Sequence, residues 1–168
     1  NCEGAPQAAR HWAFIRCTRL WSYMGTPRSK VLNEMTQTLT LVVVTIVKDD
    51  CDAFAKTLES IRVQNQSLKH VVIDGSSNEE NQKLIASSSG DAGSVYMFQS
   101  AKGIYSAMNR GLGECQDDEL VLFLNAGDCF ANSESASQVV ADSSNDGVDF
   151  LIYPCIFGES NGFIPSIE

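Results

Sequence analysis

The sequence predicts an α/β fold in which helices flank a mostly parallel sheet. Residues 39–47 form a continuous apolar run rich in β-branched side chains, which is typical of a central strand buried on both faces. Between residues 38 and 153, strand-like segments alternate with helix-like ones. Several of these strands are followed by acidic residues, at the sheet edge where such folds bind their ligands.

The order of elements follows from local signals along the chain. Asp50 is placed to cap a first helix, and Asn78 to cap a second one that carries Leu84 and Ile85. The expected strands span residues 39–47, 70–75, 94–98, 119–124 and 148–153, two further helices span 103–114 and 133–142, and residues 87–93 are expected to form a loop.

Size and charge limit the function. The 168 residues are enough for one domain with a core, and 43% hydrophobic and 20% charged residues are ordinary for a globular protein. The net charge is −9, and residues 35–168 hold seven basic and nineteen acidic side chains, a net of −12. Since nucleic-acid binding depends on Lys and Arg at phosphates, we expect no nucleic-acid partner.

No stretch of the chain is apolar enough to predict a membrane-spanning helix, which needs about eighteen apolar residues or more. Any membrane association would therefore be peripheral or lie in a missing segment. The six cysteines contain no C-x-x-C pair and the chain has only two histidines, so that a structural zinc site is not expected. We interpret the cysteines as reduced thiols of a cytoplasmic protein.

The amino-terminal segment differs from the rest. Residues 1–37 are rich in arginine and show neither strand alternation nor a sustained helical period. They lack the apolar core of a secretory signal and loosely resemble an organelle transit peptide, although Met35 would be a natural start. We expect residues 1–37 to be a poorly ordered extension and residues 38–168 to form one domain, incomplete at its carboxyl end.

Three carboxylates fall at the carboxyl ends of predicted strands. Asp49 follows the first strand, Asp74 ends the second and Asp128 follows the fourth. Each taken alone is explained by the local preference of Asp for turns and helix caps. In a doubly wound sheet, however, the carboxyl ends of the strands share one edge, where ligands bind. The three together predict a binding site at this edge.

Four ordered motifs carry a resemblance to a known family. They are TIVKDD at residues 45–50, VVIDGSSN at 71–78, KGIYSAMNRG at 102–111 and FLNAGD at 123–128. In order and approximate spacing they resemble family 2 glycosyltransferases with a GT-A fold, above all bacterial enzymes of the colanic acid and exopolysaccharide type. The resemblance covers residues 38–153 and the amino-terminal, donor-binding half of such a domain.

This resemblance implies a site for a nucleotide-diphosphate sugar. Thr45 and Lys48 would line the nucleobase pocket, and Asp74 would accept a hydrogen bond from a base N–H, since a carboxylate only accepts. Asn109 and Arg110 would face the nucleotide. Lys48 stands where many relatives carry an aromatic residue that stacks on the base.

The FLNAGD segment corresponds to the metal-binding D-x-D region of the family. Asn125 and Gly127 stand in place of its two acids, which leaves Asp128 as the expected ligand of Mg²⁺ or Mn²⁺ and Asn125 as a contact of the nucleotide. These cations favour oxygen ligands and complete their shell with substrate phosphates, so that few carboxylates suffice.

The implied activity is transfer of a sugar from a nucleotide-diphosphate sugar to a glycan or lipid-linked acceptor in polysaccharide biosynthesis, in the cytoplasm or at the inner face of the membrane. No residue is identified as the catalytic base, because Glu159 and Glu168 are the only acids after Asp149 and neither lies in a recognisable motif. A truncated, non-catalytic nucleotide-binding module remains an alternative.

Two further enzyme classes lack support in the sequence. A sugar nucleotidyltransferase should carry a glycine-rich, basic loop after the first strand, but residues 47–52 contain no glycine. A dinucleotide-binding oxidoreductase should carry G-x-G-x-x-G at the same place, and this motif is absent.

Overall fold

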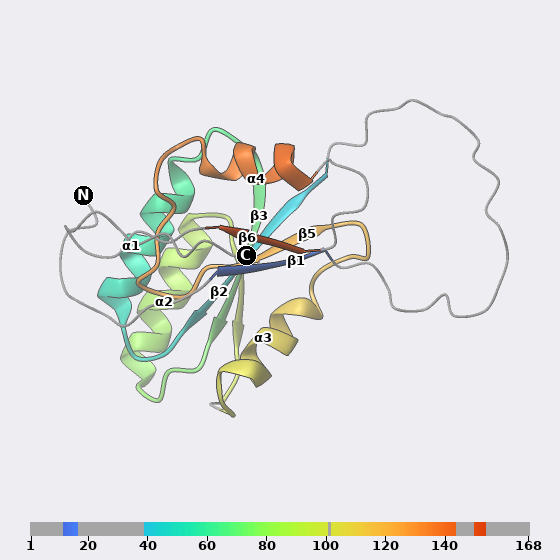
Figure 1. Cartoon of the computed structure of the whole chain (residues 1–168). Coiled ribbons are helices and arrows are strands. Elements are labelled where there is room, and N and C mark those ends of the chain that lie inside the picture. The colour runs from blue at the N-terminus through green and yellow to red at the C-terminus, as the bar shows by residue number, and fades with distance from the viewer. Residues whose placement is uncertain (1–11, 17–38, 101, 144–149, 154–168) are drawn as a thin grey trace, which may run out of the picture.

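A computed structural model of the chain describes residues 12–16, 39–100, 102–143 and 150–153. A six-stranded sheet lies between two layers of helices (Figure 1). In chain order the elements are β1 (Trp12–Arg16), β2 (Leu41–Val47), α1 (Cys51–Arg62), β3 (Leu68–Asp74), α2 (Glu79–Asp91), β4 (Val95–Phe98), α3 (Ile104–Leu112), β5 (Leu120–Phe123), α4 (Ser135–Ser143) and β6 (Phe150–Tyr153).

The predicted parallel sheet is confirmed. The strand order is β4-β3-β2-β5-β1-β6, and the first four of these strands are parallel to one another. β2 lies between β3 and β5, with Val47 opposite Asp74 and Val44 opposite Phe123. β2 is therefore the strand at which the chain order reverses, and its residues 41–45 have no exposed surface. The run of β-branched residues is buried on both faces, as expected.

One of the outer two strands differs from the expectation. Trp12–Arg16 is a strand that pairs antiparallel with β5 and with β6, although residues 1–37 were expected to be a poorly ordered extension. The sequence of this strand, WAFIR, does not alternate between apolar and polar residues, so that periodicity does not identify it. The strand expected over residues 148–153 is confirmed as β6, which follows α4. Because β1 is antiparallel to both β5 and β6, β6 runs in the same direction as β5. The rest of residues 1–37 lies outside the described part of the chain.

The predicted helix starts are correct. The Asp50 side chain accepts a hydrogen bond from Ala53 N at 2.9 Å, and Asn78 accepts one from Glu80 N at 2.7 Å. The loop expected over residues 87–93 is wrong, because α2 continues to Asp91. Burial explains the difference: Ser89 is completely buried and its hydroxyl donates to Ile85 O at 2.7 Å.

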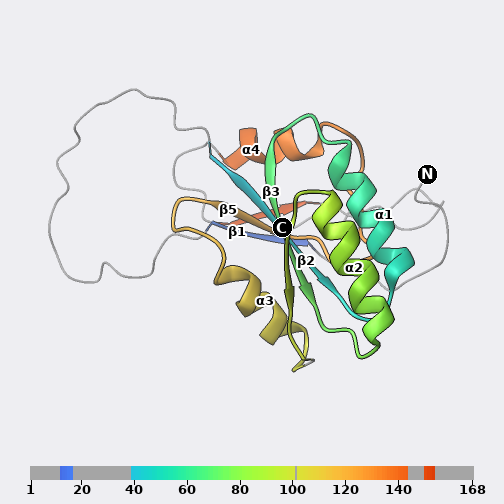
Figure 2. The ribbon, with the colours of Figure 1, turned by 180° about the vertical axis from the view of Figure 1, so that it is seen from behind.

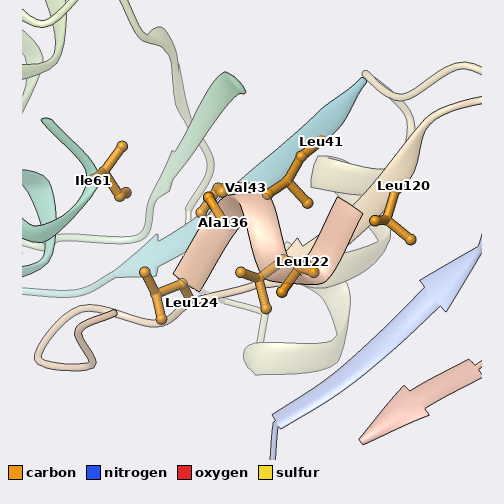
Figure 3. Packing of buried hydrophobic residues seen from close by; sticks show 8 residues of the cluster. Leu41, Val43, Ile61, Leu120, Leu122, Leu124 and Ala136 are labelled. Carbon is orange, nitrogen blue, oxygen red and sulfur yellow. The ribbon is translucent and has the colours of Figure 1, made fainter. Parts of the chain in front are cut away.

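Helices α1, α2 and α4 cover one face of the sheet and α3 covers the other, which the view from behind also shows (Figure 2). Side chains of β2 and β5 meet Ile61 of α1 and Ala136 of α4 in one core cluster (Figure 3). In α2 the expected apolar pair is divided, because Ile85 is buried and Leu84 is 52% exposed. Within the described residues, no helix is long and apolar enough to cross a bilayer.

The close contact between α3 and β2 depends on a glycine. Gly111 is buried, and a Cβ at this position would overlap Cγ1 of Val44. The Gly111→Ala variant should therefore lose about 1–3 kcal/mol of unfolding free energy through overpacking, measured by urea denaturation. Gly90→Ala in α2 is the matched control, since nothing lies within 4 Å of its added Cβ. Equal or greater stability of Gly111→Ala would contradict the packing argument.

Candidate functional site at the carboxyl edge of the sheet

The carboxyl ends of β2, β3 and β5 lie side by side and bring the predicted carboxylates to one edge. Asp74 is the last residue of β3 and pairs with Val47, the last residue of β2. Asp49 lies two residues after Val47 in the chain. After β5 the chain continues beside β2, where Ala126 N donates to Ile46 O at 3.0 Å. The edge therefore lies at the reversal of strand order, where sheets of this type bind ligands.

Asp74 is held by the protein on both carboxylate oxygens. Its Oδ1 accepts a hydrogen bond from Ser76 N and its Oδ2 one from the Tyr96 hydroxyl, each at 2.8 Å. Asp74 has no exposed surface. The structure thus places this carboxylate at the expected edge, but beneath the surface and with its direction fixed.

Asp49 joins the end of β2 to the loop after β3. Its backbone has a positive φ of 54°, which Asp tolerates better than most residues. Its carboxylate accepts hydrogen bonds from Ser77 N and Ser77 Oγ at 2.8 Å, and its own N–H donates to Ser76 Oγ at 2.8 Å. The hydrogen bond from the Ser77 hydroxyl is the main cause that lowers the pKa of Asp49. The carboxylate therefore stays ionised and holds residues 76–78 in place.

A tight turn follows β5. Asp128 N donates to Asn125 O at 2.9 Å, and Gly127 adopts a φ of 95°. This left-handed conformation is strained for any residue with a Cβ, which gives a physical reason for a glycine where the D-x-D pattern has an acid. Gly127 N donates to Thr57 Oγ1 at 2.9 Å and to Ala53 O at 3.1 Å, which fastens the turn to α1.

The turn offers few oxygen ligands for a metal ion. Among the described residues, no three His, Cys, Asp or Glu side chains are grouped as a metal site. Asp128 contributes one carboxylate, and Asn125 Oδ1 is buried without a hydrogen-bond partner. A buried amide oxygen of this kind is an available ligand for a hard cation. The pair fits a cation that takes its other ligands from phosphate and water, and does not fit a site made of protein ligands alone.

The structure separates the two residues predicted to line the base pocket. Thr45 is completely buried in the sheet, where its hydroxyl lies 2.9 Å from His70 Nε2. Lys48 is exposed at the end of β2. Only Lys48 therefore reaches the surface of the edge.

Asn109 and Arg110 lie away from the three carboxylates. β4 ends at the carboxyl edge and β5 begins at the opposite one, so that α3 runs back across the sheet between them. Both residues are exposed in the second half of α3, with Arg110 in its last turn. The start of the KGIYSAMNRG motif, at Lys102 and Gly103, is the part that lies near the carboxyl edge.

Three residues of the edge were not predicted from the sequence. Tyr96 and Ser76 bind the Asp74 carboxylate, and Thr57 binds the turn that contains Gly127. Thr57 is separated from that turn by seventy residues, and Tyr96 meets Asp74 only through the pairing of β3 with β4. Tyr96 lies two residues before Phe98, which pairs with Asp74. This relation could have identified Tyr96 only if the register of β3 and β4 had been known.

Comparison with known proteins identifies the family. The sequence profile of Glycosyl transferase family 2 matches residues 42–164, most of the chain. The chain belongs to glycosyl transferase family 2. Uncharacterized glycosyltransferases from two Mycobacterium tuberculosis strains, CDC 1551 and H37Rv, are each 33% identical to it over 117 residues, or 67% of the chain. The chain spans 43% of the length of these relatives.

Solved structures confirm the GT-A type of α/β fold for this family 2 chain. The mannosyltransferase PcManGT from Pyrobaculum calidifontis, solved with GDP-Man and Mn²⁺, has a TM-score of 0.58 and 15% identity. The match covers 67% of this chain and 34% of that one. TarS of S. aureus has a TM-score of 0.50 and 19% identity over 61% of this chain and 32% of its own.

The hydroxyl of Thr57 should stabilise the turn of this family 2 chain. Thr57 is completely buried, and Thr57→Val keeps its shape while it removes the acceptor for Gly127 N. We expect a loss of about 0.5–1.5 kcal/mol of unfolding free energy, the usual net contribution of one hydrogen bond, because Gly127 N keeps its hydrogen bond to Ala53 O. Thr57→Ser keeps the hydroxyl and is the control in urea denaturation. A loss in Thr57→Ser but none in Thr57→Val would show that the methyl group, and not the hydroxyl, stabilises the turn.

His70 should make the stability depend on pH. Its ring lies 2.7 Å from Ser94 Oγ and 2.9 Å from Thr45 Oγ1, and burial lowers the pKa of His70 to about 4. The unfolded chain takes up this proton near pH 6.5, so that the folded state loses stability as the pH falls from 6.5 towards 4. The loss should approach about 3 kcal/mol for a shift of this size.

The His70→Gln variant separates this effect from the titration of the carboxylates. It keeps a polar side chain but has no proton to gain, so that its unfolding free energy should fall less between pH 6.5 and 4.5 than that of the wild type. Urea denaturation at several pH values measures the difference. The same slope in both proteins would contradict the assignment to His70.

Proposed function

We propose that the protein transfers a sugar from a nucleotide-diphosphate sugar to an acceptor. The observation that carries this proposal is the placement of Asp74, Asn125 and Asp128 at one edge of the sheet in a member of glycosyl transferase family 2. Glycosyl transfer is the activity of the family's relatives by name. The edge supplies an acceptor for a base at one end and oxygen ligands near a diphosphate at the other.

The nucleobase would bind near the ends of β2 and β3. Asp74 accepts hydrogen bonds and cannot donate them while ionised, so that it favours a base with a ring N–H. Lys48 is exposed beside it and offers a positive charge. Thr45 is enclosed in the core and would act on this pocket only through the packing of β2.

The diphosphate would lie between the Asn125–Asp128 turn and the start of α3. Lys102 is exposed at the residue before Gly103, and the first turn of α3 has no side-chain cap and no acid. Both features favour an anion there. Arg110 lies at the far end of α3, so that Lys102 is the better placed of the two basic residues. Asn109 likewise has no direct role in this arrangement.

Asp128 and the Asn125 Oδ1 atom would hold Mg²⁺ or Mn²⁺ together with the diphosphate. When bound, the cation would neutralise the charge of the leaving nucleoside diphosphate. The presence of GDP-Man and Mn²⁺ in the P. calidifontis mannosyltransferase supports this proposal. The turn would orient the ligands, because Gly127 is fastened to α1 by two hydrogen bonds.

The acceptor and the cellular setting extend the proposal beyond the described residues. We infer a glycan or lipid-linked acceptor of the exopolysaccharide type, used in the cytoplasm or by peripheral association with the inner face of the membrane. The motifs GIYSAMNRG and FLNAGD support this choice through their resemblance to such enzymes.

Donor binding without transfer is the second candidate function. Among the described residues after Asp128, the carboxylates are Glu134 and Asp142, and Asp142 accepts a hydrogen bond from the Tyr153 hydroxyl at 2.6 Å. Neither lies in the turn after β5, so that no described carboxylate after Asp128 is placed as a general base beside the Asn125–Asp128 pair. Release of nucleoside diphosphate in the presence of an acceptor distinguishes transfer from binding alone.

Asp128→Ala should weaken metal-dependent nucleotide binding by about tenfold or more, because the turn loses its one carboxylate. Calorimetry with UDP, GDP and their sugars, with and without Mn²⁺, measures this effect. Glu59→Ala removes an exposed acid of α1 and is the control. Binding that ignores both Mn²⁺ and Asp128 would refute the metal site, and no nucleotide binding at all would refute the donor site.

A further inference from the structure

The edge strand β4 contributes one polar contact to the site. The Tyr96 hydroxyl donates to Asp74 Oδ2 at 2.8 Å, across the parallel pairing of β3 with β4. The ring of Tyr96 packs against a core cluster that includes Val72 and Ile85, which fixes the position of its hydroxyl. The hydroxyl therefore approaches the carboxylate from one direction.

The contact persists over the physiological range of pH. Burial, and then the hydrogen bond to Asp74 and its charge, raise the pKa of the Tyr96 phenol above its ordinary value. The phenol thus remains protonated and remains a donor. Hydrogen bonds to charged groups are stronger than neutral ones, and Asp74 has no exposed surface through which water could replace this partner.

Two fixed donors determine which way the carboxylate can accept a ligand. An ionised carboxylate has about four acceptor sites, and Ser76 N and the Tyr96 hydroxyl each occupy one on different oxygens. Because Asp74 is completely buried, a base reaches it only when neighbouring groups at the edge move slightly. The two donors hold the direction of the remaining lone pairs during that movement.

This geometry bears on which base is accepted. The ring nitrogens N3 of uracil and N1 of guanine carry a hydrogen, whereas N3 of cytosine and N1 of adenine carry a lone pair that would face the carboxylate. A site built to accept a hydrogen bond rejects a ligand that lacks the donor, because its buried polar group is then left unpaired. The difference in affinity between the two kinds of base is largest when the Asp74 carboxylate cannot rotate away from the base.

We propose that Tyr96 is a positioning residue that fixes Asp74 and thereby sets the preference of the site for nucleotides whose base carries a ring N–H. The inference rests on the proposed donor-binding function, in which Asp74 reads the base. Tyr96 acts through Asp74 and does not itself contact the nucleotide.

The test compares Tyr96→Phe with Tyr153→Phe. Both variants remove a phenol hydroxyl that donates to a carboxylate, but Tyr153 donates to Asp142 and lies on β6, at the opposite end of the strand order from β4, so that its variant is a matched control. Calorimetry gives the affinities of each protein for UDP, GDP, CDP and ADP with Mn²⁺, and circular dichroism and urea denaturation verify the fold. In the wild type, UDP or GDP should bind about tenfold more tightly than CDP and ADP.

Tyr96→Phe should reduce this preference by about three- to tenfold, because a hydrogen bond to a charged group is lost, whereas Tyr153→Phe should leave it unchanged. An equal weakening for all four nucleotides would assign Tyr96 a structural role only, and an unchanged preference would also overturn the inference. A wild-type protein that binds nucleotides but shows no such preference would overturn it while the donor-binding function stands. A wild type that binds none of them would refute both.

A second variant covers the case in which Tyr96→Phe does not fold. Asp74→Asn keeps an oxygen that can accept from Tyr96 and adds an amide donor that a ring lone pair can accept. Its preference should shift towards CDP or ADP by several-fold. If its preference equals that of the wild type, Asp74 does not read the base and Tyr96 has no specificity to set.

Discussion

The parallel pairing of β2 with β3 on one side and with β5 on the other is the constraint on which the rest of the structure depends. Because β2 is buried on both faces, helices must cover the sheet on both sides, and α3 comes close enough to require Gly111 at Val44. The same pairing aligns the carboxyl ends of three strands. The chemistry of the edge is a consequence of how this apolar strand is buried.

Most polar groups at the edge are hydrogen-bonded within the protein itself. Asp49 holds the loop after β3, Asp74 accepts from Ser76 and Tyr96, and Thr57 fastens the turn after β5. Such internal hydrogen bonds fix the directions of the groups and reduce the reorganisation that binding requires. Asn125 Oδ1 differs, because it is buried without a partner and so remains available to a ligand.

Elements that depend on residues close together in the sequence were predicted. Elements that depend on contacts between residues far apart in the sequence were not. The apolar run of β2 and the caps Asp50 and Asn78 act within a few residues, and all three are confirmed. The extension of α2 through its serines depends on the burial of Ser89, and the strand at Trp12–Arg16 depends on partners more than a hundred residues away. Local propensity carries no information on either.

The sequence by itself determined the α/β class, the mostly parallel arrangement of the strands, the family and the three carboxylates at the strand ends. Periodicity, cap residues and motifs encode these features within short windows. Only the tertiary structure decided that Thr45 faces the core, that Asn109 and Arg110 lie at the far end of α3, and that Tyr96 meets Asp74. Direction and depth of a side chain depend on how strands pair and how helices return across the sheet, and residues that are adjacent in a motif can therefore be separated in space.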